Sequence, residues 1–157
     1  LYARGKREID ADDVLATVAD ASGLVLDAVV DAAFAGRAGD LETQLAKARA
    51  AGIAPARIVA AALTQAAQLH RARIGVEAGS PVAEVVDQML PKAQFRRRGA
   101  VEAAVAAWTA TRLEGVMADL AAASLETRRL SGPVADLADP VVSRALLIAA
   151  TAARRRA

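Results

Sequence analysis

The chain has 157 residues, of which 55% are hydrophobic and only 3% aromatic, and its formal net charge is +2. This length suits one domain with a core of its own, and abundant alanine with few strand-forming residues favours packed helices over sheets. The lack of cysteine excludes disulfides and thiolate metal sites, and a single histidine excludes a multi-histidine metal centre.

The first residues predict a junction between two folded units. LYARGKREIDADDV indicates a helix end, a turn, and a new helix capped by Asp10, with Asp12 and Asp13 near the positive end of its dipole. We interpret the chain as a fragment of a longer polypeptide. Because no secretory signal or membrane-spanning run is recognisable, we expect a cytoplasmic protein with no membrane partner.

The next helix is predicted to restart at Ser22 or Gly23 and to end at Gly36. Asp27 and Asp31 lie four residues apart and form its polar stripe, while its other faces are apolar. We therefore expect a nearly buried helix whose two aspartates form a solvated stripe.

Two helices of different character are predicted to follow. A short, more polar helix begins at Gly39 and ends at Gly52, with a narrow inward stripe. Pro55 then opens a long helix that is expected to continue to about Ile74, before Gly75. We expect this long helix to be the centre of the bundle.

Capping signals divide the second half of the chain. Ser80 followed by a first-turn proline begins a short helix, and a linker carries Arg96, Arg97 and Arg98. An apolar stripe leads to Trp108, which we expect to pack in the core at a corner between helices.

The last helices are also delimited by local signals. Thr111 with Glu114 matches a capping box for the next helix, which ends near Gly132, and Asp139 precedes the final helix. The sequence thus predicts an all-α fold, a compact bundle of six to eight helices.

The residue types that perform catalysis have simpler structural explanations. His70 falls close to the apolar face of the long helix, so we expect it at the edge of the core. The paired aspartates could be an acid and a base or magnesium ligands, but dipole compensation and a solvated stripe explain them better. No glycine-rich phosphate-binding loop occurs. We expect no catalytic site, no metal and no cofactor.

The arginine clusters are the candidate contact residues for nucleic acid or a protein partner. Guanidinium groups bind phosphates and carboxylates in a bidentate manner. Arg128 and Arg129 are also explained as cations that offset a helix dipole. Arg96, Arg97 and Arg98 begin a segment and repel one another unless they are solvated or paired with an anion.

The order of elements resembles the C-terminal region of the δ subunit of the bacterial DNA polymerase III clamp loader. The resemblance lies in REIDADDVLATVAD, AAFAG, KARAAGIAP, PARIVAAALTQAAQLHRAR, PKAQFRRRGAVEAAVAAWT and SLETRRLSGP, which together extend over nearly the whole chain. It implies that residues 1–20 end an AAA+-like lid region and that residues 21–157 are a helical collar, or oligomerisation, domain.

The resemblance also implies a non-catalytic role in DNA replication. The collar would join the other clamp-loader subunits, contact the sliding clamp only through an N-terminal domain, and meet primed DNA indirectly. The parent complex would be classed as a DNA-directed DNA polymerase. The alternative is a stand-alone helical nucleic-acid-binding module that uses Arg96 to Arg98 and the tail Arg154–Arg156.

Overall fold

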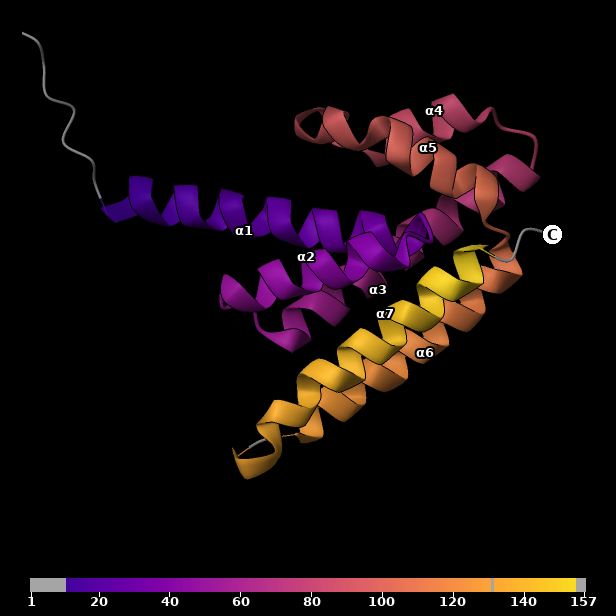
Figure 1. Ribbon diagram of the computed structural model, residues 1–157. Helices are drawn as coiled ribbons and strands as arrows, with labels where there is room; N and C mark the ends of the chain where they lie inside the picture. The colour runs from indigo at the N-terminus through magenta and orange to yellow at the C-terminus, as the bar shows by residue number, and fades with distance from the viewer. Residues whose placement is uncertain (1–10, 131, 155–157) are drawn as a thin grey trace, which may run out of the picture.

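The computed structural model describes residues 11–130 and 132–154, and over these ranges it contains seven α-helices, two 3-10 segments and no strand (Figure 1). The predicted all-α bundle of six to eight helices is therefore confirmed. In chain order the elements are α1 (Ala11–Phe34), α2 (Ala38–Ala50), α3 (Pro55–Glu77), α4 (Val82–Met89), η1 (Lys92–Arg97), α5 (Arg98–Ala107), α6 (Ala110–Arg129), η2 (Gly132–Leu137) and α7 (Ala138–Arg154).

Helix α1 is continuous where the sequence predicted a new start. It passes through Ser22 and Gly23 without a break and ends at Phe34. Glycine lowers helix propensity by only about 1 kcal/mol, which the packing of the following turns against the core outweighs. The same helix also crosses the predicted boundary between residues 20 and 21, and residues 1–10 with the Asp10 cap lie outside the described part.

Helix α3 is central, as predicted. It packs against α1, α4, α5, α6 and α7 and buries one continuous face. It continues past Gly75 to Glu77. The glycine lies where α4 packs closely on α3: a Cβ on Gly75 would lie 3.4 Å from a methyl group of Val85 in α4. The stop comes at Gly79, whose φ of 101° favours glycine.

The corner between α5 and α6 is built on Trp108. Its side chain is buried, its ring packs on Phe34, and its indole N–H donates a hydrogen bond of 2.9 Å to the carbonyl oxygen of Phe34 at the end of α1. The predicted core position of Trp108 is thus confirmed. The predicted capping box at Thr111 is wrong, since the side-chain oxygen of Thr109 accepts from the backbone N–H of Arg112 and caps α6.

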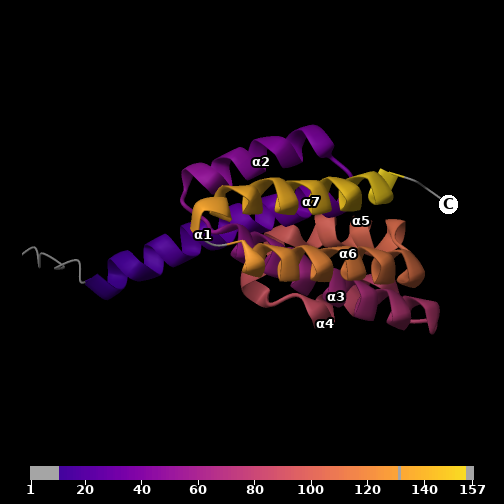
Figure 2. The ribbon, with the colours of Figure 1, turned by 90° about the horizontal axis from the view of Figure 1, so that it is seen from below.

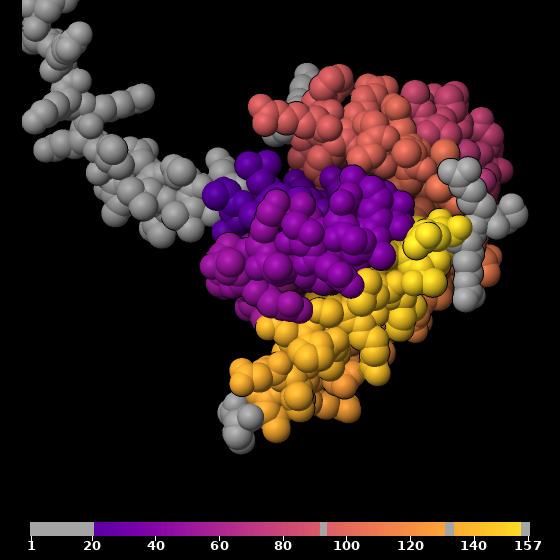
Figure 3. All heavy atoms as spheres, in the orientation of Figure 1, coloured from indigo at the N-terminus to yellow at the C-terminus, as the bar shows by residue number. Residues whose placement is uncertain are grey.

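Helices α6 and α7 form an antiparallel hairpin along one side of the molecule. In the view from below, α7 runs between α2 and α6, and α6 and α7 lie side by side (Figure 2). In the space-filling view the hairpin forms the lower edge, and its far end stands clear of α2 (Figure 3). Within residues 11–130 and 132–154, one long face of the hairpin is therefore left without an intramolecular neighbour.

Among the described helices, none combines the length and the apolar character that crossing a membrane requires.

Candidate functional site

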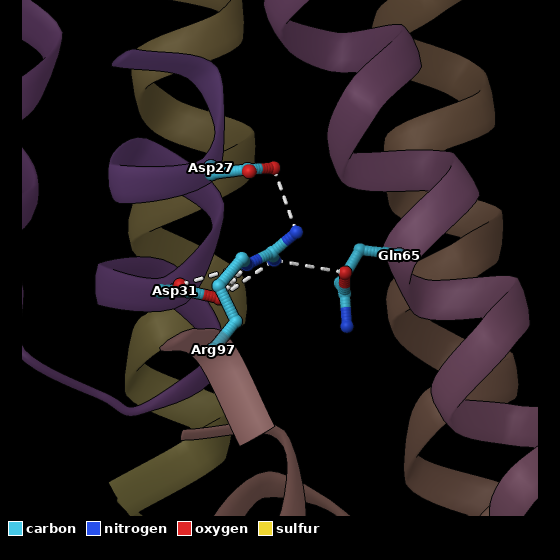
Figure 4. A network of polar contacts seen from close by, with 4 residues as sticks. All are labelled: Asp27, Asp31, Gln65 and Arg97. Carbon is cyan, nitrogen blue, oxygen red and sulfur yellow. Dashed lines mark hydrogen bonds and ion pairs between the residues drawn. The ribbon is translucent and has the colours of Figure 1, made fainter. Parts of the chain in front are cut away.

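Arg97 joins three segments of the chain through its guanidinium group (Figure 4). Its Nη1 donates to Oδ1 of Asp27 at 2.6 Å, and its Nη2 donates to Oδ1 of Asp31 at 2.7 Å. The Nε also donates to Oδ2 of Asp31 at 3.0 Å, which makes this pair bidentate, and Nη2 further reaches Oε1 of Gln65 at 3.1 Å. Arg97 thus connects the end of η1 to α1 and α3.

Burial and charge act together in this network. The side chain of Arg97 is only 13% exposed. Burial alone would lower the pKa of Arg97, but the hydrogen bond to Asp31 and the charges of Asp31 and Asp27 outweigh it and raise the pKa. The pKa of Asp27 is also raised, because desolvation and the nearby Asp31 outweigh the attraction of Arg97. The aspartates are therefore not the solvated stripe that the sequence predicted.

Arg98 has intramolecular partners as well. Its Nη1 lies 2.5 Å from Oδ1 of Asp87 in α4, and its Nε donates to Oε1 of Glu102 at 2.8 Å. These contacts raise the pKa of Arg98, with the hydrogen bond to Glu102 as the largest cause. The guanidinium also lies 5.9 Å from the ring centre of the exposed Phe95. Of the three adjacent arginines, Arg96 is the exposed one.

Arg128 and Arg129 form a second, separate group. Both are exposed in the last turn of α6, where their positive charge interacts favourably with the negative C-terminal end of the helix dipole. Figure 1 shows this end of the hairpin and α5 on opposite sides of the layer that contains α1 and α2. The structure therefore does not bring the five candidate arginines into one site. Arg155 and Arg156 of the predicted basic tail lie outside the described residues.

His70 lies at the edge of the core, as predicted. Its side chain is 21% exposed, and its Nε2 is 3.2 Å from Oε1 of Glu114 in α6. The described residues contain no group of three or more histidine, aspartate or glutamate side chains arranged to hold a metal ion. The contact of His70 with Glu114 links α3 to α6.

A concave feature that no sequence pattern indicated lies between α6 and α7, on one side of the hairpin. It is an open groove of about 790 Å³. A smaller hollow of about 210 Å³ shares three of its lining residues and continues toward the far end of the hairpin. These shared residues are Asp119, Arg144 and Ile148. We call the residues that line the two hollows the hairpin face.

Arg112 lies in the wall of the groove and has an unusual environment. Its guanidinium carbon is 5.1 Å from the ring centre of Trp108, which fixes the side chain by a cation–π contact. Its Nη2 is buried without a hydrogen-bond partner among the described residues. A buried donor without an acceptor is costly, and this nitrogen is closed off from solvent in the wall of the groove.

No protein-family model, no curated protein and no solved structure matches this chain.

Proposed function

We propose that this chain is a non-catalytic assembly domain, the collar of a clamp-loader δ subunit, which supports loading of the sliding clamp onto primed DNA. Its partners would be the other clamp-loader subunits. The clamp would be reached through an N-terminal domain, and DNA only indirectly. The order of helices and motifs along the whole sequence supports this proposal.

The observation that carries the assembly role is the apolar surface of the hairpin. Leu125 in α6, Leu137 in η2 and Ile148 in α7 are 55%, 53% and 45% exposed. Of these three, Ile148 lines the hairpin face, and an exposed apolar side chain in a groove is typical of a surface that binds another protein. The hairpin face offers such a surface without disturbing the core.

The ion pairs of Arg97 and Arg98 argue against the alternative, a stand-alone nucleic-acid-binding module. The guanidinium of Arg97 is already paired with two carboxylates. It could neutralise a DNA phosphate, and so release a counterion from DNA, only if these ion pairs first broke. Of the predicted Arg96–Arg98 patch, Arg96 is left as the readily available charge.

The test is to mix the chain with the other clamp-loader subunits and to follow complexes by native mass spectrometry and size-exclusion chromatography. We expect co-migration with at least one subunit, and loss of it in Ile148→Glu. Ala83→Glu, on the exposed surface of α4, is the matched control and should co-migrate normally.

Absence of co-migration in every mixture would contradict the assembly role. Tight DNA binding by the chain alone, with a steep salt dependence that Arg96→Ala reduces, would instead support the nucleic-acid module.

A further inference from the structure

Three charged side chains occur at equal intervals along the outer side of α6. Arg112, Asp119 and Glu126 are separated by seven residues each, which is close to two helical turns and keeps them on one side of the helix. All three line the hairpin face. The positive charge therefore lies near one end of the face, an acid lies near the other, and Asp119 marks the middle.

The residues between these charges permit a close approach. Gly115 has no side chain and Ala122 has a small one, so neither protrudes from the α6 side of the hairpin face. A Cβ added to Gly115 would meet no other atom within 4 Å. Ile148 of α7 projects beside the middle of the face and is 45% exposed. Small side chains around one exposed apolar anchor fit the central part of an interface between two helical surfaces.

We propose that the hairpin face binds a second copy of this chain, with the two α6 helices antiparallel and a two-fold axis near Asp119 and Ile148. A two-fold contact requires a surface that carries both members of each complementary pair. Rotation about this axis places Arg112 of each copy opposite Glu126 of the other, because the two residues are equally distant from Asp119.

The environment of Arg112 favours this arrangement. Arg112 is half-buried and lines the groove, so the carboxylate of Glu126 from the second copy can approach the part of the side chain that faces the groove, while Nη2 itself is closed off. Glu126 is free to change partners, because its link to Arg144 in the same chain is long at 3.7 Å and exposed. Arg144 then lies near both copies of Asp119 and offsets the repulsion between them.

The inference concerns the chain alone and does not rest on the proposed function. Its test is analytical ultracentrifugation of the full chain over a wide range of concentration. We expect a species of twice the 16.1 kDa chain mass to grow with concentration. Ile148→Glu should weaken the dimer at least about tenfold, because it buries a charge at the contact, and the control Ala83→Glu should not.

A charge exchange tests the antiparallel register. Arg112→Glu places two acids opposite each other, and Glu126→Arg places two bases opposite each other, so each variant alone should sediment as a monomer. Mixed together they should form a heterodimer, because opposite charges face each other again at both contacts. Circular dichroism melts show whether each variant is folded; if Arg112→Glu is not, Arg112→Gln takes its place, and Glu126→Arg alone must still be monomeric.

A chain of wild-type sequence that stays monomeric at every concentration would overturn the inference, as would a dimer that none of these substitutions weakens. Both proposals use the hairpin face, so a second copy and a clamp-loader subunit would exclude each other there. A chain that stays monomeric but co-migrates with a subunit overturns only this inference, whereas a dimer that co-migrates with none overturns only the proposed function.

Discussion

Arg97 is the residue on which the contact between three segments depends. Its carboxylate partners lie 66 and 70 residues earlier in the chain, and its side chain is largely withdrawn from water. A buried ion pair adds little net stability compared with apolar packing, but removal of one member leaves the other charged and unpaired. Arg97 and its neighbour Arg96 should therefore respond very differently to the same substitution.

We expect Arg97→Ala to lower the free energy of unfolding by about 3 kcal/mol, because it leaves Asp27 and Asp31 without their cation. Arg96→Ala is the matched control, and its exposed side chain should contribute no more than about 0.5 kcal/mol. Urea unfolding followed by circular dichroism measures both values.

The same measurement on Asp31→Ala and on the double variant completes a mutant cycle. The two losses should be clearly less than additive, because each substitution breaks the same bidentate pair. Simple additivity would show that the ion pair does not form.

The raised pKa of Asp27 predicts a dependence of stability on pH. The folded chain holds this proton more tightly than the unfolded chain, whose carboxyl titrates near 3.8. Ionisation of Asp27 therefore lowers the free energy of unfolding as the pH rises above that value and through the pKa of the folded state. Asp27→Asn cannot titrate, so the stability of the wild type relative to this variant should fall as the pH rises from about 3.8 through the pKa of the folded state.

Thermal melts of the two proteins over this range check the sign. A difference that stays constant with pH, or that grows as the pH rises, would contradict the raised pKa.

At the scale of elements, two glycines end helices with the same backbone conformation in different surroundings. Gly36 after α1 has a φ of 71° and Gly52 after α2 has a φ of 69°. A Cβ on Gly36 would lie 2.8 Å from Cγ of Arg154 and 3.2 Å from the carbonyl oxygen of Ala150 in α7, whereas a Cβ on Gly52 would meet open space. The missing side chain of Gly36 thus permits both the left-handed turn after α1 and the close packing of α7 on it.

We expect Gly52→Ala to cost about 1 kcal/mol, the strain of a left-handed alanine. Gly36→Ala carries the same strain and also forces α7 to shift, so we expect at least ~2 kcal/mol in total. Chemical denaturation of both variants measures the difference. Equal costs would show that α7 does not pack closely on this turn.

At the scale of the whole molecule, the described core begins late in α1. The first fully buried apolar side chain described in this helix is Val29, and Leu24 is 64% exposed. The chain without residues 1–20 should therefore keep one cooperative unfolding transition, because it retains the described core from Val29 onward. Calorimetry checks this, and loss of the transition would show that residues 1–20 belong to the same folding unit.

Several features of the fold follow from the sequence alone. Apolar spacing predicted the helices and the central place of α3, and it placed Trp108 in the core and His70 at its edge. These signals are local, because a helix face repeats every three or four residues and a terminating glycine acts on its own turn. The same locality explains the wrong helix start at Ser22 or Gly23 and the wrong cap at Thr111, because residues nearby in the sequence carry similar start and cap signals.

The roles of charged side chains were decided only by the tertiary structure. Nothing local distinguishes Arg97 from Arg96, and the difference arises because α1 brings two carboxylates to one of them from 66 and 70 residues away. The hairpin face also forms only in the tertiary structure, since residues of both α6 and α7 line it. Composition and periodicity determine that this chain folds into helices; how those helices pack determines which charges are neutralised and which surface stays open.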